Sequence, residues 1–196
     1  MNFKIPKEIL GDWNDLDKSK LNFPKFKYVN RSSSLIKTWN YMSGLEDYLK
    51  LTKNKKVIDI GSGNGAAMEI FRHFKYDVLA VDRGDREMNH DFKLMIESQK
   101  IPFLQHDCCK IPYPIESQSY DILLAMGSII NILGKDMSRT KELLNEFSRI
   151  SKHTIFLVVN NGPHLEQARF DLMNWQHNNF KLTSHINAFT FRYDKG

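Results

Sequence analysis

The chain has 196 residues, of which 41% are hydrophobic and 26% charged, and its formal net charge is +5. This length and composition suit a single globular domain and exclude a disordered chain. No apolar run approaches the roughly 18 residues that cross a bilayer, and the amino-terminal residues lack the apolar segment of a signal peptide, so we expect a cytoplasmic protein without membrane contact.

The first 50 residues predict an irregular arm that precedes a main domain of residues 51–196 within one globular unit. Pro6 and Pro24 interrupt regular structure. Ser32–Ser34 are predicted to cap a helix, whose apolar residues are Leu35, Ile36, Trp39, Leu45 and Leu49. Residues 18–31 interleave basic and aromatic side chains, a pattern that suits either binding of single-stranded nucleic acid or a lid whose aromatic residues pack on the core.

From residue 55 onward, short apolar segments alternate with amphipathic ones. The predicted strands are Val57–Ile60, Tyr76–Asp82, Ile101–Asp107, Tyr120–Met126 and Thr154–Val159. The predicted helices between them are Ala66–Phe74, Glu87–Gln99 and Ser138–Ile150. This alternation predicts a doubly wound α/β fold, with a mostly parallel sheet, helices on both faces and ligands at the carboxyl ends of the strands.

The last 30 residues depart from this alternation. A helix is predicted from about Leu165 to Trp175, followed by two strand-like segments, Phe180–Ile186 and Ala188–Tyr193. Because almost nothing separates the two segments, they are predicted to pair as an antiparallel hairpin. Earlier in the chain, the two cysteines, Cys108 and Cys109, are adjacent, so we expect neither a disulfide framework nor a metal site.

A glycine-rich turn follows the first predicted strand in V-I-D-I-G-S-G-N-G. Gly61, Gly63 and Gly65 allow a close approach of the backbone and of the next helix to a ligand. Asp82 ends the second strand, where a carboxylate can accept both hydroxyls of a ribose. These features alone suit either a dinucleotide or S-adenosylmethionine.

Two carboxylates favour S-adenosylmethionine. Asp59, buried two residues before the first glycine, is a poor neighbour for a pyrophosphate and a good one for an ammonium group. Asp107, after the third strand, can accept a hydrogen bond from an adenine amino group. The closing hairpin and the short chain point the same way. Structural roles remain alternatives: backbone N–H groups for Asp59, a helix cap for Asp82 and a turn for Asp107.

From about Lys55 to Tyr193, the chain resembles the class I S-adenosylmethionine-dependent methyltransferases. The resemblance lies in four segments taken in order: the glycine-rich turn, A-V-D at Asp82, H-D-C-C-K-I-P-Y-P at Asp107, and S-Y-D-I-L-L-A-M-G-S. It implies a seven-stranded Rossmann-like fold that ends in a reversed hairpin. It also implies S-adenosyl-L-methionine as cofactor and S-adenosyl-L-homocysteine as product.

The same resemblance implies the cofactor-binding residues. The glycines would face the methionine part, Asp59 its amino group, Asp82 the ribose, Asp107 and Cys108 the adenine, and the backbone from Met126 to Ser128 the sulfonium. The full expected set is Asp59, Gly61, Ser62, Gly63, Asn64, Gly65, Asp82, Arg83, Asp107, Cys108, Met126 and Gly127.

The methyl acceptor is less defined, because transfer from a sulfonium needs an acceptor held in line and only sometimes a base. Catalytic candidates are His164, Ser128 and Asn131, of which only His164 is a plausible neutral base, although a surface histidine without a role explains it equally well. Substrate-binding candidates are Tyr28, Arg31, Trp39, Tyr41, Ser128, Asn131, Asn160 and His164.

The acceptor class is expected to be a small molecule. The fourth strand ends in A-M-G-S, which disfavours the N-P-P-Y type of nucleic-acid methylase. Alternatives are an RNA or DNA methyltransferase, a noncatalytic S-adenosylmethionine-binding partner protein, and another transfer such as aminopropyl transfer. We further expect the arm to act as a lid, so that residues 51–196 would fold and bind the cofactor without it.

Overall fold

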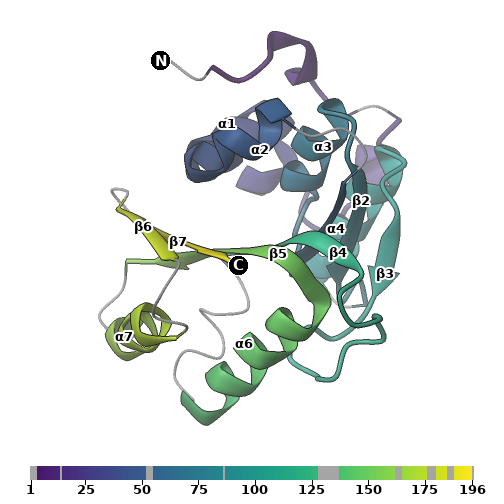
Figure 1. The fold of residues 1–196 in the computed structure, drawn as a ribbon. Helices are drawn as coiled ribbons and strands as arrows, with labels where there is room; N and C mark the ends of the chain where they lie inside the picture. The colour runs from purple at the N-terminus through teal and green to yellow at the C-terminus, as the bar shows by residue number, and fades with distance from the viewer. Residues whose placement is uncertain are drawn as a thin grey trace.

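The computed structural model describes residues 4–13, 15–51, 55–85, 87–127, 137–161, 165–175, 180–184 and 188–195. Within them, seven strands form one sheet in the order β3-β2-β1-β4-β5-β7-β6 (Figure 1). The strands are β1 (Lys56–Ile60), β2 (Asp77–Asp82), β3 (Phe103–Gln105), β4 (Tyr120–Met126), β5 (Ser151–Asn160), β6 (Phe180–Ser184) and β7 (Ala188–Asp194). The predicted doubly wound α/β fold is confirmed.

The first five strands are parallel, and the last two run antiparallel at the β5 edge. The predicted hairpin of β6 and β7 is confirmed, and β7 inserts between β5 and β6. The central strand β1 is buried from Val57 to Ile60 because it lies between β2 and β4 and is covered on both faces. Strand order therefore brings the ends of β1, β2 and β4 together.

Helices cover both faces of the sheet, as Figure 1 shows. One face carries α3 (Ala66–His73) and α4 (Glu87–Ser98), and its core includes Phe71 and Ile96. The other carries α6 (Met137–Ile150) and α7 (Glu166–Asn174), with Phe147 and Leu172 in its core. None of the helices in the described ranges has the length and apolar character that a membrane span requires.

The amino-terminal arm consists of short helical turns followed by helices. Its elements are η1 (Lys7–Ile9), η2 (Lys18–Lys20), η3 (Lys27–Val29), α1 (Arg31–Tyr41), η4 (Met42–Leu45) and α2 (Glu46–Leu51). The predicted cap at Ser32–Ser34 is wrong: the Asn30 side chain caps α1 by accepting from the Ser33 N–H at 2.9 Å. The sequence predicts one helix that includes Leu45 and Leu49, whereas α1 ends at Tyr41 and is followed by η4 and α2. Ile36 is 44% exposed rather than part of the core.

Three polar links join the arm to the rest of the chain. The Arg31 guanidinium forms a buried ion pair with Glu69 of α3. Arg192 of β7 donates to both carboxylate oxygens of Asp47 in α2, each at 2.8 Å. The Asp91 carboxylate of α4 accepts from the N–H groups of residues 22 and 23, also at 2.8 Å. These contacts connect the arm to α3, α4 and the sheet.

Apolar packing makes the same connection. Leu35, Trp39, Met42 and Leu45 are buried in one core cluster with α3 and β1. Burying four large side chains stabilises the fold by several kcal/mol, at roughly 1.5–3 kcal/mol each. The arm therefore contributes buried side chains to the core of the domain, and whether residues 51–196 fold without it stays a prediction.

Candidate active site

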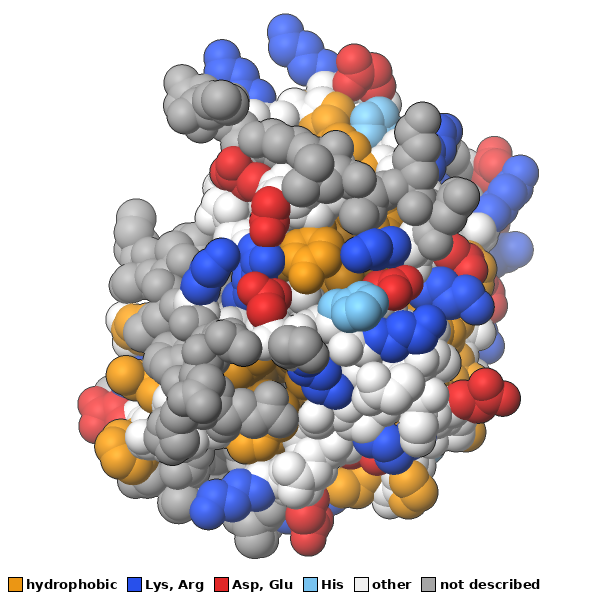
Figure 2. Space-filling view, in the orientation of Figure 1, with side chains coloured by type: hydrophobic (Ala, Val, Ile, Leu, Met, Phe, Trp, Pro, Cys, Tyr) orange, Lys and Arg blue, Asp and Glu red, His pale blue; other side chains and the backbone are white. Residues whose placement is uncertain are grey.

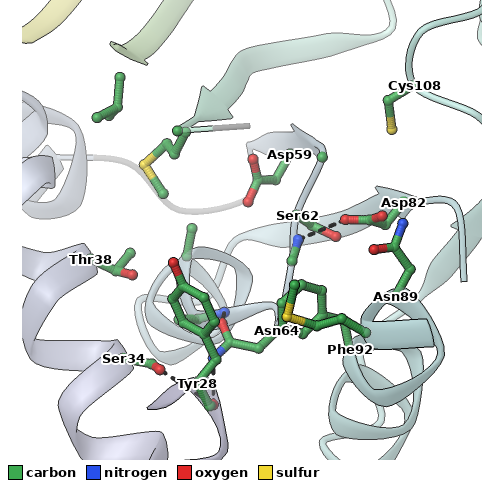
Figure 3. A pocket seen from close by; sticks show the side chains of 18 of the residues that line it. Tyr28, Ser34, Thr38, Asp59, Ser62, Asn64, Asp82, Asn89, Phe92 and Cys108 are labelled. Atoms are coloured by element: carbon green, nitrogen blue, oxygen red, sulfur yellow. Dashed lines mark hydrogen bonds between the residues drawn. The ribbon is translucent and has the colours of Figure 1, made fainter. Parts of the chain in front are cut away.

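A cavity of about 480 Å³ opens at the carboxyl ends of β1, β2, β4 and β5. The strand ends and the glycine-rich turn form one wall, which we call the sheet wall. Residues of η3 and α1 form the opposite wall, the arm wall. Figure 3 shows the side chains of Asp59, Asp82 and Tyr28, all three of which line this cavity. The predicted location of the ligand site is thus where the cavity lies.

The glycine-rich turn needs its glycines for two different reasons. Gly63 has a φ of +54°, which side-chain-bearing residues rarely adopt, and its N–H donates to the Asp82 carboxylate at 2.9 Å. Gly65 has a φ of +78°, and a Cβ atom there would lie 2.9 Å from Cγ1 of Ile96 in α4. Gly63, which lines the cavity, thus allows the bond to Asp82, while Gly65 allows α3 to pack against α4.

Asp59 is a buried carboxylate that faces the cavity. Its side chain is 2% exposed, and its Oδ1 atom has no hydrogen-bond partner within the described part of the chain. Burial raises the pKa of Asp59 to about 8, and the negative charge of Asp82 adds to this shift. An unpartnered buried carboxyl oxygen carries a free-energy cost that a cationic ligand would remove. Among the described residues, no backbone N–H group donates to this oxygen, so the alternative of a purely structural Asp59 is not supported there.

Asp82 is held by the backbone at the end of β2. It accepts from the Gly63 N–H at 2.9 Å and from the Arg83 N–H at 2.7 Å. Burial raises the pKa of Asp82, and these two hydrogen bonds oppose that shift. The carboxylate caps the glycine-rich turn rather than a helix, and it faces the cavity with its orientation fixed in advance.

The loop after β3 brings Asp107 and Cys108 to the same cavity. Asp107 also accepts from the Cys109 N–H at 3.1 Å, so it shapes a turn as well as facing the cavity. Cys108 is buried, and burial raises the pKa of its thiol. Arg83 lies 4.0 Å from the Asp107 carboxylate and 3.4 Å from that of Asp85.

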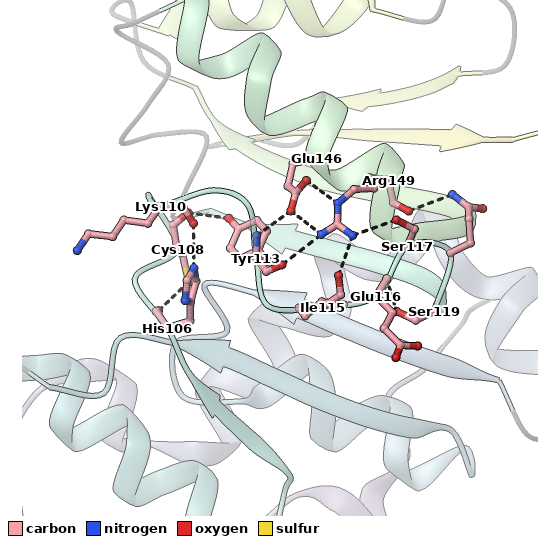
Figure 4. A network of polar contacts seen from close by, with 11 residues as sticks. His106, Cys108, Lys110, Tyr113, Ile115, Glu116, Ser117, Ser119, Glu146 and Arg149 are labelled. Carbon is pink, nitrogen blue, oxygen red and sulfur yellow. Dashed lines mark hydrogen bonds and ion pairs between the residues drawn. The ribbon is translucent and has the colours of Figure 1, made fainter.

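A polar network anchors this loop to α6 (Figure 4). The Arg149 guanidinium donates to the carbonyls of Ile115 and Tyr113 at 2.7 and 3.2 Å, and to the Glu146 carboxylate at 2.7 Å. Glu146 in turn accepts from the Tyr113 N–H at 2.7 Å. The Tyr113 hydroxyl then donates to the Cys108 carbonyl at 2.6 Å. The position of Cys108 at the cavity therefore depends on α6.

The arm wall is formed by Tyr28 of η3 and by one face of α1. The carbonyl of Tyr28 accepts from the Asn64 side chain at 3.1 Å, so the glycine-rich turn holds the arm in place. The Tyr28 ring packs edgewise on Phe92 of α4, with a centroid distance of 5.7 Å. Figure 3 shows this ring extending from the arm into the cavity, beside Thr38.

Most predicted site residues come together at this cavity. Those that line it are Tyr28, Tyr41, Asp59, Gly61, Ser62, Gly63, Asn64, Asp82, Arg83, Asp107, Cys108, Met126, Gly127 and Asn160. Ser62 is of note because its buried hydroxyl oxygen has no hydrogen-bond partner in the described ranges.

Three predicted residues are not placed at the cavity. Arg31 is 6% exposed and paired with Glu69, and Trp39 is 4% exposed in the apolar core, so neither has a surface for a substrate. Gly65 supports helix packing instead. The catalytic candidates Ser128, Asn131 and His164 lie outside the described residues.

Sequence reasoning missed several cavity residues. Ser34, Lys37 and Thr38 of α1 line the cavity together with Tyr41, and so do Met88, Asn89 and Phe92 of α4. The α1 residues stand at positions i, i+3, i+4 and i+7, which share one helix face. That polar stripe, opposite the apolar Leu35 and Trp39, is the signal that could have found them.

Comparisons with known proteins agree with this geometry. Residues 58–159, a little more than half of the chain, match the family model described as "Methyltransferase domain". A search of curated proteins found no significant match.

Solved structures share the fold at low sequence identity. An S-adenosylmethionine-dependent methyltransferase from Archaeoglobus fulgidus is 14% identical, with a TM-score of 0.61 over 84% of this chain and 94% of that one. Another from Aquifex aeolicus is 15% identical, with a TM-score of 0.53 over 87% and 99%. A human methyltransferase 10 domain containing protein is 14% identical, with a TM-score of 0.55 over 79% and 80%.

The cavity fits the cofactor of that family on two independent observations. The unpartnered Asp59 oxygen suits an ammonium group, and the oriented Asp82 carboxylate suits the hydroxyls of a ribose. The chain belongs to the methyltransferase-domain family, and its cofactor is S-adenosyl-L-methionine.

Proposed function

We propose that this protein transfers a methyl group from S-adenosyl-L-methionine to a small-molecule acceptor. The observation that carries the proposal is the cavity of about 480 Å³, which lies between the strand ends and an arm fastened to the same domain. A cavity of this size suits small ligands. The cofactor supplies a methyl group on a sulfonium, which is already a good leaving group. The residues of the chain then need to bind, orient and exclude water.

Residue roles follow from the two walls. On the sheet wall, Asp59 would accept from the ammonium group of the cofactor, Asp82 from its ribose hydroxyls and Asp107 from its adenine amino group. The backbone at Met126 and Gly127 would lie near the sulfonium. On the arm wall, Tyr28 and Tyr41, together with Asn160 at the end of β5, would contact the acceptor. Each role uses a residue that lines the cavity.

The arm carries an observation that favours a nucleic-acid acceptor. Lys18, Lys20, Lys25 and Lys27 are all exposed along it. The face drawn in Figure 2 favours the small molecule, because Lys and Arg side chains are interspersed there with Asp and Glu rather than gathered in a patch of one sign. Oligonucleotide binding that weakens steeply with salt would support the nucleic-acid alternative.

Two measurements test the proposal. Calorimetry should show binding of S-adenosylmethionine and S-adenosylhomocysteine and none of NAD, because Asp59 disfavours a pyrophosphate. Methyl-labelled S-adenosylmethionine should then place label in a metabolite fraction and not in RNA or DNA. Preferred binding of NAD would contradict the cofactor site, and label in nucleic acid would contradict the acceptor class. Cofactor binding without any labelled acceptor would favour the noncatalytic alternative.

A further inference from the structure

The charges that line the cavity are unevenly distributed. The carboxylates of Asp59, Asp82 and Asp107 all belong to the sheet wall and to the loop after β3. Among the described residues, two cations line the cavity, and Arg83 already lies 3.4 Å from the Asp85 carboxylate and 4.0 Å from that of Asp107. Lys37 on the arm wall pairs with no carboxylate among the residues that the structure describes. The acidic side chains of the cavity thus lie on one side, and the Lys37 ammonium lies on the other.

The position of Lys37 is set by the helix that carries it. Ser34, Lys37, Thr38 and Tyr41 form the stripe of α1 that faces the cavity, while Leu35, Trp39 and Met42 on another side of the same segment are buried in the core. The Lys37 ammonium lies 5.8 Å from the centroid of the Tyr28 ring and 5.8 Å from that of the Tyr41 ring. Both rings attract a cation placed over them, so they hold the ammonium at the cavity.

We propose that the arm wall is a carboxylate-binding subsite, in which the Lys37 ammonium, between the Tyr28 and Tyr41 rings, pairs with a carboxylate of a bound ligand. The inference rests on the proposed function and adds to it the chemistry of the group that is recognised. The carboxylate can come from the methionine part of the cofactor or from the methyl acceptor. Both sources use the same pairing of an ammonium with a carboxylate.

The chain offers a matched control in Lys27. Its ammonium also lies near the Tyr28 ring, at 5.1 Å from the centroid, but Lys27 does not line the cavity. Lys37→Met removes the charge and keeps most of the apolar side chain, Lys37→Arg keeps the charge, and Lys27→Met removes a cation from the same ring without touching the subsite. Only Lys37→Met should change ligand recognition.

The first experiment is calorimetry with S-adenosylmethionine and with its decarboxylated form, which keeps the ammonium and lacks the carboxylate. If the subsite holds the carboxylate of the cofactor, Lys37→Met should weaken S-adenosylmethionine about 10- to 100-fold, the range expected for a lost charge-assisted pair. Affinity for the decarboxylated form should not change. Lys37→Arg and Lys27→Met should resemble the parent protein.

The second experiment follows label from methyl-labelled S-adenosylmethionine into a metabolite extract that is separated on an anion exchanger. If the subsite holds the carboxylate of the acceptor, label should enter the retained, anionic fraction, and Lys37→Met should lower that rate at least about 10-fold with cofactor affinity unchanged. Unchanged cofactor affinity in Lys37→Met, combined with label only in the unretained fraction or in none, would overturn the subsite. A parent protein that fails to bind S-adenosylmethionine would instead contradict the proposed function.

Discussion

The two walls of the cavity are built by different means. On the sheet wall, Asp59 and Asp82 stand at the ends of neighbouring parallel strands, and the turn that they flank lies within the same βαβ unit. On the arm wall, Tyr28 and α1 are held by contacts between distant parts of the chain, including Arg31 with Glu69, 38 residues apart, and Asp47 with Arg192, 145 residues apart. The comparison separates a ligand site made by local topology from one made by long-range packing.

This difference predicts which changes affect stability and which affect binding. On the sheet wall, a side chain that binds the ligand is positioned by its own strand, so replacing it should leave the packing of other elements intact. Contacts of the arm wall hold whole helices in place, so their loss reaches the core. Changes in the arm wall should therefore lower the free energy of unfolding, whereas changes in the sheet wall should lower cofactor affinity.

The largest effect is expected from deleting the arm. A protein that begins near Leu51 loses Leu35, Trp39, Met42 and Leu45 from the core cluster shared with α3. At roughly 1.5–3 kcal/mol for each buried side chain, this loss is comparable to the total stability of a typical domain. We expect the truncated protein to lack a cooperative thermal transition in calorimetry. A truncated protein that melts cooperatively and binds S-adenosylmethionine would support the prediction that the arm is a lid that the domain does not need for folding.

The second effect concerns the ion pair between the arm and α3. The Arg31 and Glu69 side chains are 7% and 6% exposed, so removing one partner leaves a buried charge without its counterpart. Arg31→Met should lower the free energy of unfolding by about 3–5 kcal/mol in urea denaturation. The double variant Arg31→Met/Glu69→Met should recover much of this loss, because it buries no unpaired charge. Equal stability of Arg31→Met and the parent would show that this ion pair does not stabilise the fold.

The third effect belongs to the sheet wall. Asp82→Ala should weaken binding of S-adenosylhomocysteine by about 2–4 kcal/mol, as expected when charge-assisted hydrogen bonds to a ribose are lost. The change in stability should be smaller, since only the caps of the Gly63 and Arg83 N–H groups are removed. Asp85→Ala is the control, because this nearby carboxylate does not line the cavity. Calorimetry that finds Asp82→Ala and Asp85→Ala alike would assign the ribose to another residue.

The smallest effect, measured per pH unit, is a pH dependence of stability that originates at Asp59. Its folded-state pKa of about 8 lies above the ordinary value of 3.8, so the folded protein binds more protons than the unfolded chain between these values. This contribution to stability is complete below pH 3.8 and is lost as the pH rises through 8, by at most about 1.4 kcal/mol per pH unit. Between pH 5 and 8, the cofactor-free Asp59→Asn variant should lose less stability than the parent in urea denaturation. Parallel pH profiles would show that Asp59 is ionised throughout.

Most of the sheet wall can be predicted from the sequence. Apolar runs locate the strands, and parallel topology places the residues at their ends on one edge, so the sequence alone assigns Asp59 and Asp82 to the site. The sequence also assigns Gly65 to the ligand, because nothing in it shows that Ile96 of α4 lies against this glycine. Local patterns thus locate backbone positions and do not distinguish contact with a ligand from contact with a helix.

The arm wall can be predicted only in part. Tyr28 and Tyr41 face the cavity as the sequence predicts, whereas Arg31 and Trp39 do not. The reason is that nothing local pairs Arg31 with Glu69, which lies 38 residues away. An isolated arginine in an arm resembles a ligand contact until its buried partner is known.

The contact between Asp47 and Arg192 has a consequence for synthesis of the chain. Asp47 is made 145 residues before Arg192, the partner that fastens α2 to β7. At about 5–20 residues per second, a ribosome needs on the order of ten seconds to cover that interval. During this time the apolar face of α1 has no completed sheet beside it. Until Arg192 has been made, a nascent chain therefore holds Asp47 of α2 without the partner that fastens it to the sheet.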